Sequence, residues 1–151
     1  MITPDRDIIL AAKAELQTAL AAYVRPGDIF VTPHVAFVPS SVRPPCVGIK
    51  DGKIKREELA GGCVDHEIEV LFCLFVAIRK EEASIVGDPS TGAKGLLQLR
   101  DDLHAVLHQN TLDVPGVQSA FAAKETGSDL FESGAGMAQR KIVTYTYEVQ
   151  R

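Results

Sequence analysis

The chain has 151 residues, of which 46% are hydrophobic and 24% are charged, and this composition predicts a globular domain with its own core. Its 16 basic and 20 acidic residues give a formal net charge of −4, and no run of Lys or Arg exceeds two residues. Surfaces that bind nucleic acids are basic, so specific binding to nucleic acid is not expected.

The three cysteines, Cys46, Cys63 and Cys73, are odd in number and have no CxxC spacing, which argues against a disulfide framework or a structural zinc site. The N-terminal residues lack the features of a secretion signal. The longest apolar run, residues 70–78, is too short to cross a bilayer as a helix. We therefore expect a soluble intracellular protein with reduced thiols.

The N-terminal part of the sequence predicts a helix and a short strand. Residues 3–23 place apolar side chains at helical spacing, with Thr3 as the N-cap and Pro4 at the first helical position. Residues 28–32 follow as a short strand. The next stretch, residues 33–45, holds four prolines, which cannot donate to a strand ladder, so it is interpreted as an edge strand or an extended arm.

A hairpin is predicted next. Residues 46–50 form a strand that reaches a turn at Asp51 and Gly52, a dipeptide that is common in hairpin turns. Residues 53–58 form its charged return. Residues 59–62, which include two glycines, are interpreted as a flexible joint before the next strand.

The longest strand pattern, residues 65–80, is predicted to be the centre of the sheet. Its even positions from Ile68 to Ile78 are apolar, whereas its odd positions are charged at both ends and apolar in the middle. This pattern indicates a second face that is covered only at its centre, and another subunit could supply that cover. At about 3.3 Å per residue the stretch would span roughly 53 Å, so we expect it to bend or to project beyond its own core.

A second helix is predicted from a cap at Ser90 or Thr91 to about residue 109, with Asn110 as its C-terminal stop. Residues 117–121 are a strand candidate. Residues 127–136 are interpreted as a mobile loop. The apolar stripe of the helix is Leu96, Leu99, Leu103, Val106 and Leu107.

The final segment, residues 138–149, alternates with period two and predicts a strand that pairs beside the central one. The segments therefore follow in the order helix, strands, helix, strands. This order predicts an α+β fold: a mixed, mostly antiparallel sheet with two helices packed on one face, in a single domain over residues 1–151.

Two histidines are the strongest candidates for chemistry. His104 and His108 are four residues apart on the second predicted helix, a spacing that can present two imidazoles to one metal ion, but the HExxH order is missing. The structural interpretation is two histidines at the solvent edge of the apolar stripe. A small cytosolic metal-binding or ligand-binding enzyme domain that uses this helix is the alternative function.

Other polar groups give weaker signals. Asp65, Glu67 and Glu69 could act with His66 in acid–base catalysis, but strand alternation places His66 on the opposite face. Ser40, Ser41 and Cys63 are not next to an evident base. The sequence therefore predicts no catalytic residue, no metal site and no cofactor.

Several strings have a counterpart in a known family. They are the N-terminal helix and residues 44–52, 67–79, 82–88, 95–107, 117–121 and 139–148. In their order and content these segments resemble the tail terminator family of long-tailed phages and prophages, the lambda-type minor tail or tail completion proteins. The resemblance covers nearly the whole chain.

The resemblance implies a non-enzymatic structural protein of the virion tail, assembled in the host cytoplasm. Its subunits would form a homo-oligomeric ring, expected to be a hexamer, that caps the tail tube, ends tube polymerisation and offers a surface for head joining. The implied partners are other copies of the chain, the tail tube protein and the head-completion or connector protein.

Ring closure is a heterologous contact, so each subunit needs two different surfaces that match. Charged residues beside the predicted hairpin and at the exit of the central strand are the candidates for these contacts, and they are equally well interpreted as solvated turns. The candidate interface residues are Lys50, Asp51, Lys53, Lys55, Arg56, Glu57, Arg79, Lys80, Glu81 and Glu82.

Overall fold

A computed structural model of the chain describes residues 2–133 and 136–151. Three helices and six strands are found in these residues, with short 3₁₀ turns at Pro26–Asp28 and Ala60–Gly62. In chain order the elements are α1 (Asp5–Ala19), β1 (Ile29–Val31), β2 (Cys46–Glu58), β3 (Val64–Ala77), α2 (Glu81–Val86), α3 (Leu96–Leu107), β4 (Val117–Glu125), β5 (Asp129–Ser133) and β6 (Gly136–Gln150).

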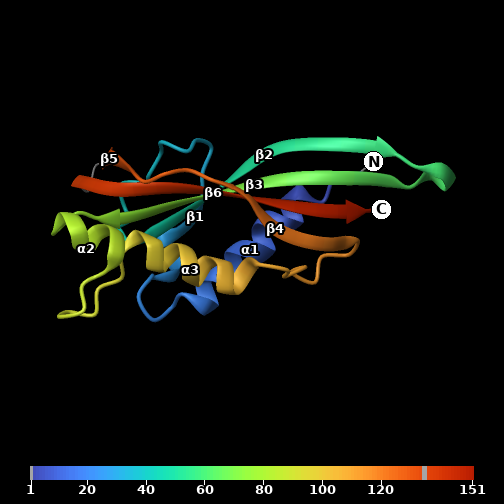
Figure 1. The fold of residues 1–151 in the computed structure, drawn as a ribbon. Coiled ribbons are helices and arrows are strands. Elements are labelled where there is room, and N and C mark those ends of the chain that lie inside the picture. The colour runs from blue at the N-terminus through green and yellow to red at the C-terminus, as the bar shows by residue number, and fades with distance from the viewer. Residues whose placement is uncertain (1, 134–135) are drawn as a thin grey trace.

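The six strands form one sheet in the order β1-β2-β3-β6-β4, and β5 also pairs with β6. Strand β1 is parallel to β2, whereas the other pairs are antiparallel. Helices α1 and α3 lie on one side of this sheet (Figure 1). The predicted α+β fold, with helices packed against a mixed and mostly antiparallel sheet, is confirmed.

Strand β3 is the centre of the sheet, as predicted. It pairs with β2 on one edge and with β6 on the other, and its register with β6 runs from Asp65 opposite Gln150 to Ala77 opposite Ala138. The C-terminal strand therefore lies beside the central strand, which confirms the second strand prediction. The long antiparallel pairing follows from the period-two pattern in both segments.

The main core lies between the sheet and the two longer helices. The apolar stripe of α3 is buried through its four leucines, and α1 contributes Ile8, Ala12 and Leu16. The sheet meets them with alternate residues of β3 and β6, as period-two packing requires. These strand residues are Ile68, Val70, Phe72, Leu74, Val76, Val143, Tyr145, Tyr147 and Val149.

The other face of the sheet has a smaller core that the chain covers by itself. Cys73 and Phe75 on β3 are fully buried beneath Val42 and its neighbours in residues 33–45, and Phe131 on β5 packs against this group. The interpretation that another subunit covers this apolar centre is therefore wrong. The sequence could not reveal the cover because prolines and valines of a loop carry no strand or helix period.

The predicted hairpin turn at Asp51 and Gly52 is also wrong. Strand β2 runs through both residues, with an irregularity in its register to β3 between Asp51 and Ile54. The glycine serves close packing instead, since a Cβ there would lie 2.7 Å from Leu71 Cδ1 and 2.8 Å from the Glu69 carbonyl oxygen. The chain reverses at residues 59–63, where Gly61 and Gly62 have positive φ angles.

Both predicted helices begin at other residues than expected. Pro4 is the N-cap of α1, and the Thr3 hydroxyl instead accepts a hydrogen bond of 2.8 Å from Arg56 Nη2. Helix α1 ends at Ala19, four residues earlier than predicted. Gly95 is the N-cap of α3, because the Gln98 side chain can reach back to its amide (2.9 Å).

The residues predicted to cap α3 lie in a turn ahead of it. The hydroxyl and the amide of Ser90 both donate to the Asp88 carboxylate, and the Ala93 amide donates to Thr91 Oγ1. Capping residues also favour turns of this kind, so their sequence signal is ambiguous. The short helix α2, which precedes the turn, was not predicted.

The predicted mobile loop over residues 127–136 contains a strand. Strand β5 pairs with the start of β6, from Asp129 opposite Arg140 to Ser133 opposite Gly136. Arg140 also donates to both carboxylate oxygens of Asp129, at 3.1 and 2.7 Å. Residues 134 and 135 of the predicted loop lie outside the described residues.

Figure 1 shows that the far end of the β2–β3 hairpin extends beyond α1 and α3. This agrees with the expectation that the central strand projects beyond its own core. The last residue is held at this end of the sheet, where Arg151 and Val64 exchange backbone hydrogen bonds of 3.2 and 2.7 Å.

Candidate functional site

The outer edge of β2 is the longest open strand edge on its side of the sheet. Strand β1 pairs only with Val47, Gly48 and Ile49, and Thr32 extends this contact by one hydrogen bond to the Ile49 carbonyl. From Lys50 to Glu58, β2 has no strand neighbour on this edge within the described residues. Such an edge can accept a strand of another chain, and charged side chains normally limit this pairing.

The candidate interface residues on β2 are largely exposed. Lys50 is engaged locally, because its Nζ donates to the Asp51 backbone oxygen at 2.9 Å. Arg56 is held by the Thr3 hydroxyl. Lys53 and Lys55 are exposed and have no ion pair among the described residues. They place two positive charges along the open edge, and Lys55 is opposite Glu67 of β3.

The acidic residues of β3 lie on the face of the sheet opposite the helices. Glu67 is opposite Lys55, and Asp65 is opposite Glu57. A shallow hollow of about 230 Å³ runs over this charged part of the hairpin, between Lys55, Glu57, Asp65, Glu67, Gln118 and Glu148. The arrangement is a charged surface of mixed sign.

His66 is separated from these carboxylates, as strand alternation predicts. Its cross-strand neighbours Arg56 and Val149 share its side of the sheet, and its side chain is buried. Neither ring nitrogen has a hydrogen-bond partner among the described residues. The acid–base group considered from the sequence is therefore not assembled.

The other candidate interface residues lie at the opposite end of β3. Arg79 and Lys80 follow the strand, and Glu81 and Glu82 are exposed in the first turn of α2. Lys55, opposite Glu67, is roughly 40 Å from Arg79 at the usual rise of a strand. The structure thus divides the candidates into two separate surfaces.

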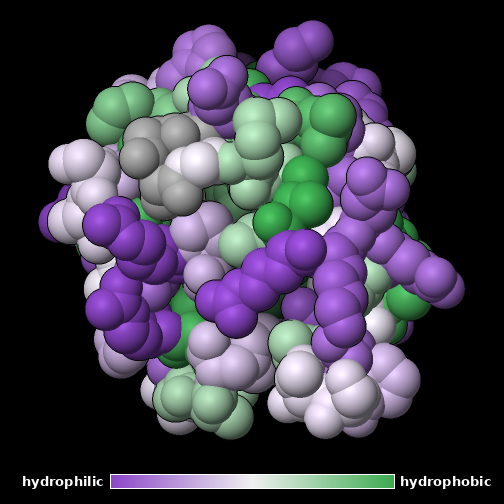
Figure 2. All heavy atoms as spheres, turned by 90° about the vertical axis from the view of Figure 1, so that its left-hand side faces the viewer, coloured by the Kyte–Doolittle hydropathy of each residue, from purple (hydrophilic) through white to green (hydrophobic). Residues whose placement is uncertain are grey.

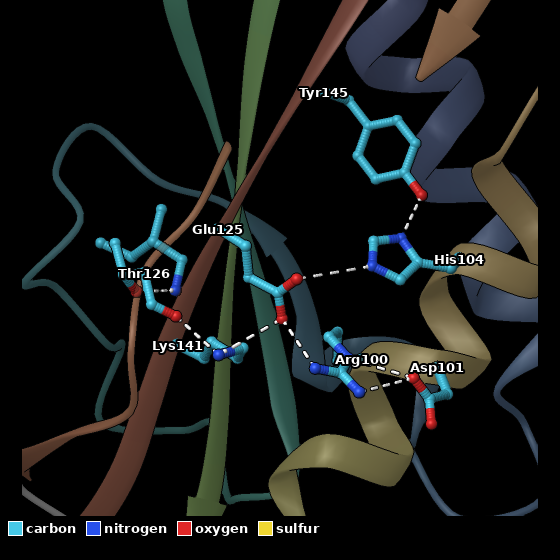
Figure 3. A network of polar contacts seen from close by, with 8 residues as sticks. Arg100, Asp101, His104, Glu125, Thr126, Lys141 and Tyr145 are labelled. Carbon is cyan, nitrogen blue, oxygen red and sulfur yellow. Dashed lines mark hydrogen bonds and ion pairs between the residues drawn. The ribbon is translucent and has the colours of Figure 1, made fainter. Parts of the chain in front are cut away.

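His104 is engaged by other side chains of the chain. His104 Nδ1 lies 2.5 Å from the Tyr145 hydroxyl, and His104 Nε2 lies 3.9 Å from Glu125 Oε2, so both nitrogens face protein groups (Figure 3). His108 is exposed. Within the described residues no group of three His, Cys, Asp or Glu side chains could hold a metal ion.

Glu125 is the centre of a polar network that the sequence did not reveal. Its Oε1 accepts from Arg100 Nη1 at 3.1 Å and lies 3.3 Å from Lys141 Nζ (Figure 3). Lys141 is 7% exposed and also donates to the Thr126 carbonyl at 2.6 Å. The network ties the end of β4 to α3 and β6, so its role is to fix these elements. In the sequence, this network is indicated only by Lys141, the one charged residue among the apolar positions of the final strand.

The possible nucleophiles are not activated. Burial raises the pKa of the Cys46 thiol to about 12 and that of Cys73 to about 11, which keeps both as neutral, packed thiols. Cys63, Ser40 and Ser41 are exposed, and no hydrogen bond to a base is found for them in the described part of the chain.

No helix in residues 2–133 or 136–151 is long and apolar enough to span a membrane. Basic residues without an ion pair in the described structure lie on the open edge of β2 and directly after β3.

In comparisons with known proteins, no protein-family model and no curated protein matches this chain.

Proposed function

We propose that this chain is a structural ring subunit of the tail terminator kind, which caps a phage tail tube, ends its polymerisation and offers a surface for head joining. The proposal rests on the resemblance in segment order and on one observation of the fold. The sheet has two different long edges, the outer edge of β2 and the edge formed by β4 and β5, and a heterologous ring contact needs two different surfaces.

The first edge carries four basic residues within residues 50–56 of β2. The open stretch to residue 58 also holds three acidic residues, Asp51, Glu57 and Glu58. The two residues with the least compensation, Lys53 and Lys55, lie where β2 has no outer strand neighbour in the described structure.

The second edge is the opposite edge of the sheet. It is formed by β4 and β5, which both pair with β6, and residues 117–133 hold one basic and three acidic residues. Two of these acids, Glu125 and Asp129, are paired with basic residues of the same chain. The end of α3 partly covers it, because the Gln109 amide donates to the Ala120 carbonyl at 2.8 Å. The exposed acidic residue nearest its far end is Glu132.

A contact between the β2 edge of one copy and the β4–β5 edge of the next repeats around a ring. Opposite charges favour this register and disfavour contact between like edges. Such assembly requires no active site.

The test is the mass of the assembly, measured by light scattering after size exclusion, with and without a tail tube protein. We expect a ring larger than a dimer, alone or on the tube protein. The variants are Lys53→Glu/Lys55→Glu on one edge and Glu132→Lys on the other. Each should remain monomeric alone, and their equimolar mixture should assemble again, since both the unchanged pair of edges and the charge-reversed pair then join opposite charges.

Arg6→Glu is the control, because Arg6 is an exposed basic residue of α1 and belongs to neither edge. It should assemble as the natural chain does. A chain that neither assembles by itself nor binds the tube protein would refute the proposal. Rings that form equally well with both edge variants would refute the assigned contact.

A further inference from the structure

A cleft of about 480 Å³ lies at the end of the molecule opposite the β2–β3 hairpin tip. It is bounded by the end of β3, by α2 and by the turn that precedes α3, with Tyr23 and the Pro44–Pro45 pair completing the wall. Figure 2 views this end of the molecule, where hydrophilic side chains lie beside hydrophobic ones. Its volume is that of an ordinary ligand cleft.

Part of the wall is apolar. Pro44, Pro45, Val76, Ala77 and Ala83 come together there from three separate segments. Val76 is 7% exposed and belongs to the main core, so this part of the wall is backed by packed side chains. An apolar side chain that entered the cleft would bury surface against a rigid base, which favours binding.

Three basic residues line the same cleft, and their charges are weakly compensated. Arg79 is exposed and has no ion pair among the described residues. Lys80 Nζ is 3.8 Å from Asp88 Oδ2, and Lys94 Nζ is 3.6 Å from Asp102 Oδ2. Both distances exceed those of a hydrogen bond, so neither amine is tightly held and both remain available to a ligand.

The single acidic residue of the lining, Asp88, is already engaged. Its Oδ1 accepts from the Ser90 hydroxyl at 2.7 Å and from the Ser90 amide at 3.0 Å. The cleft therefore has a positive balance in a chain whose net charge is −4. This local reversal selects for an anionic ligand.

The basic residues come from two sides of the cleft. Arg79 and Lys80 follow β3, whereas Lys94 stands at the start of α3, and its Nζ lies 5.5 Å from the centre of the Tyr23 ring. A ligand that fits both sides has carboxylates on either side of an apolar group. An acidic peptide with one apolar residue between acidic residues has this order of groups.

We propose that this cleft binds an acidic segment of a partner protein. An apolar side chain of the segment packs on Val76 and the two prolines, and its flanking carboxylates pair with Arg79, Lys80 and Lys94. This site is separate from both edges proposed for ring closure and does not depend on that proposal.

The test uses a fluorescein-labelled peptide of sequence Asp-Glu-Leu-Asp-Glu and measures its binding to the full chain by fluorescence anisotropy. We expect saturable binding that weakens as salt is added. Two control peptides separate the contributions: Lys-Lys-Leu-Lys-Lys reverses the charges, and Asp-Glu-Gly-Asp-Glu removes the apolar anchor. Both should bind at least about tenfold more weakly.

Two variants of the protein locate the site. Arg79→Glu should weaken binding at least about tenfold, and Ala83→Trp should block the cleft from its exposed side. Arg6→Glu makes the same charge change far from the cleft and should bind as the natural chain does. Circular dichroism and thermal melting verify that each variant is folded.

Four outcomes would overturn the proposal. They are no saturable binding, equal binding by the Arg79→Glu and Arg6→Glu proteins, equal binding of the peptide that lacks leucine, and equal affinity for free hexanoate, which would indicate a small-molecule site. A second copy is also tested, because exposed Leu130 lies between acidic residues on β5. Self-association that Leu130→Ser and Ala83→Trp each abolish would also overturn the proposal, because the occupant would then be another copy of this chain.

Discussion

His104 on α3 and Tyr145 on β6 are joined by a contact of 2.5 Å between the imidazole Nδ1 and the phenol oxygen. The contact ties the helix layer to the sheet through a histidine that is only partly exposed. It also explains why this residue, which the sequence marks as a possible metal ligand, belongs to the support of the fold.

The first prediction concerns pH. Burial lowers the pKa of His104, an effect that Glu125 opposes in part. The unfolded chain then binds a proton that the folded chain resists, so the free energy of unfolding should fall as the pH falls through about 6.5, the usual pKa of histidine. Urea unfolding at pH values from about 7.5 to about 5.5, on both sides of the ordinary histidine pKa of about 6.5, measures this slope.

His104→Gln should reduce the slope in this pH range. His108→Gln is the matched control, because His108 is an exposed histidine on the next turn. An unchanged slope in His104→Gln would contradict the assignment of the pH dependence to this residue.

The second prediction compares two buried tyrosines of β6. The Tyr145 hydroxyl contacts His104, whereas the Tyr147 hydroxyl has no hydrogen-bond partner in the described residues. Tyr145→Phe should lower the free energy of unfolding by about 1 kcal/mol, since it leaves the imidazole unpaired. Tyr147→Phe should leave it unchanged or raise it. Urea unfolding of both variants checks the order, and equal losses would contradict it.

The third prediction concerns His66, which is 3% exposed and has two unpartnered ring nitrogens among the described residues. Burying polar groups without partners costs free energy, so His66→Leu should raise the free energy of unfolding by about 1 kcal/mol. The measurement is the urea midpoint at constant m value. A large loss of stability would indicate that the imidazole has a partner, for example a bound water molecule.

The fourth prediction concerns Glu125. Glu125→Ala removes the acceptor shared by Arg100 and Lys141 and leaves the buried ammonium with the Thr126 carbonyl alone. We expect a loss of about 1–3 kcal/mol in the free energy of unfolding. Lys141→Met should cost less, because it removes the buried charge and keeps an apolar side chain of similar length. The reverse order in urea unfolding would contradict this account.

The fifth prediction tests the role of Gly52. Gly52→Ala should destabilise the fold by about 1–3 kcal/mol, because its Cβ would clash with Leu71 and with the Glu69 backbone. Gly27→Ala is the control, since no atom lies within 4 Å of the Cβ position there. Thermal unfolding of the two variants measures the difference, and equal melting temperatures would contradict the close-packing role of Gly52.

The strand and helix patterns predicted much of the fold because they carry a clear period. Every second residue is apolar from Ile68 to Val76 in β3 and from Val143 to Val149 in β6, and the leucines of α3 repeat at helical spacing. Signals from a few residues were less reliable. Asp51–Gly52 resembles a turn although it continues a strand, and the Ser90–Thr91 pair resembles a helix cap although it forms a turn.

The separation of His66 from the acidic residues of β3 was also predictable, since it depends on strand alternation alone. The cleft beside Arg79 was not, because its walls come from segments that are far apart in the chain, such as Tyr23, Pro44 and Lys94. Nor was the network around Glu125, in which residues 100, 125 and 141 meet only after β4 is placed between α3 and β6.

The sequence by itself determined the order of the major elements, the central strand and the faces that α1, α3, β3 and β6 bury, because periodicity and hydrophobicity act over short stretches of chain. Tertiary structure alone decided which apolar faces are covered and which polar groups have a hydrogen-bond or ion-pair partner. It covered the second face of β3 with residues of the same chain, engaged both nitrogens of His104, and left the β2 edge and Arg79 with little compensation. Burial and ion pairing depend on contacts between distant segments, and only the assembled fold supplies these contacts.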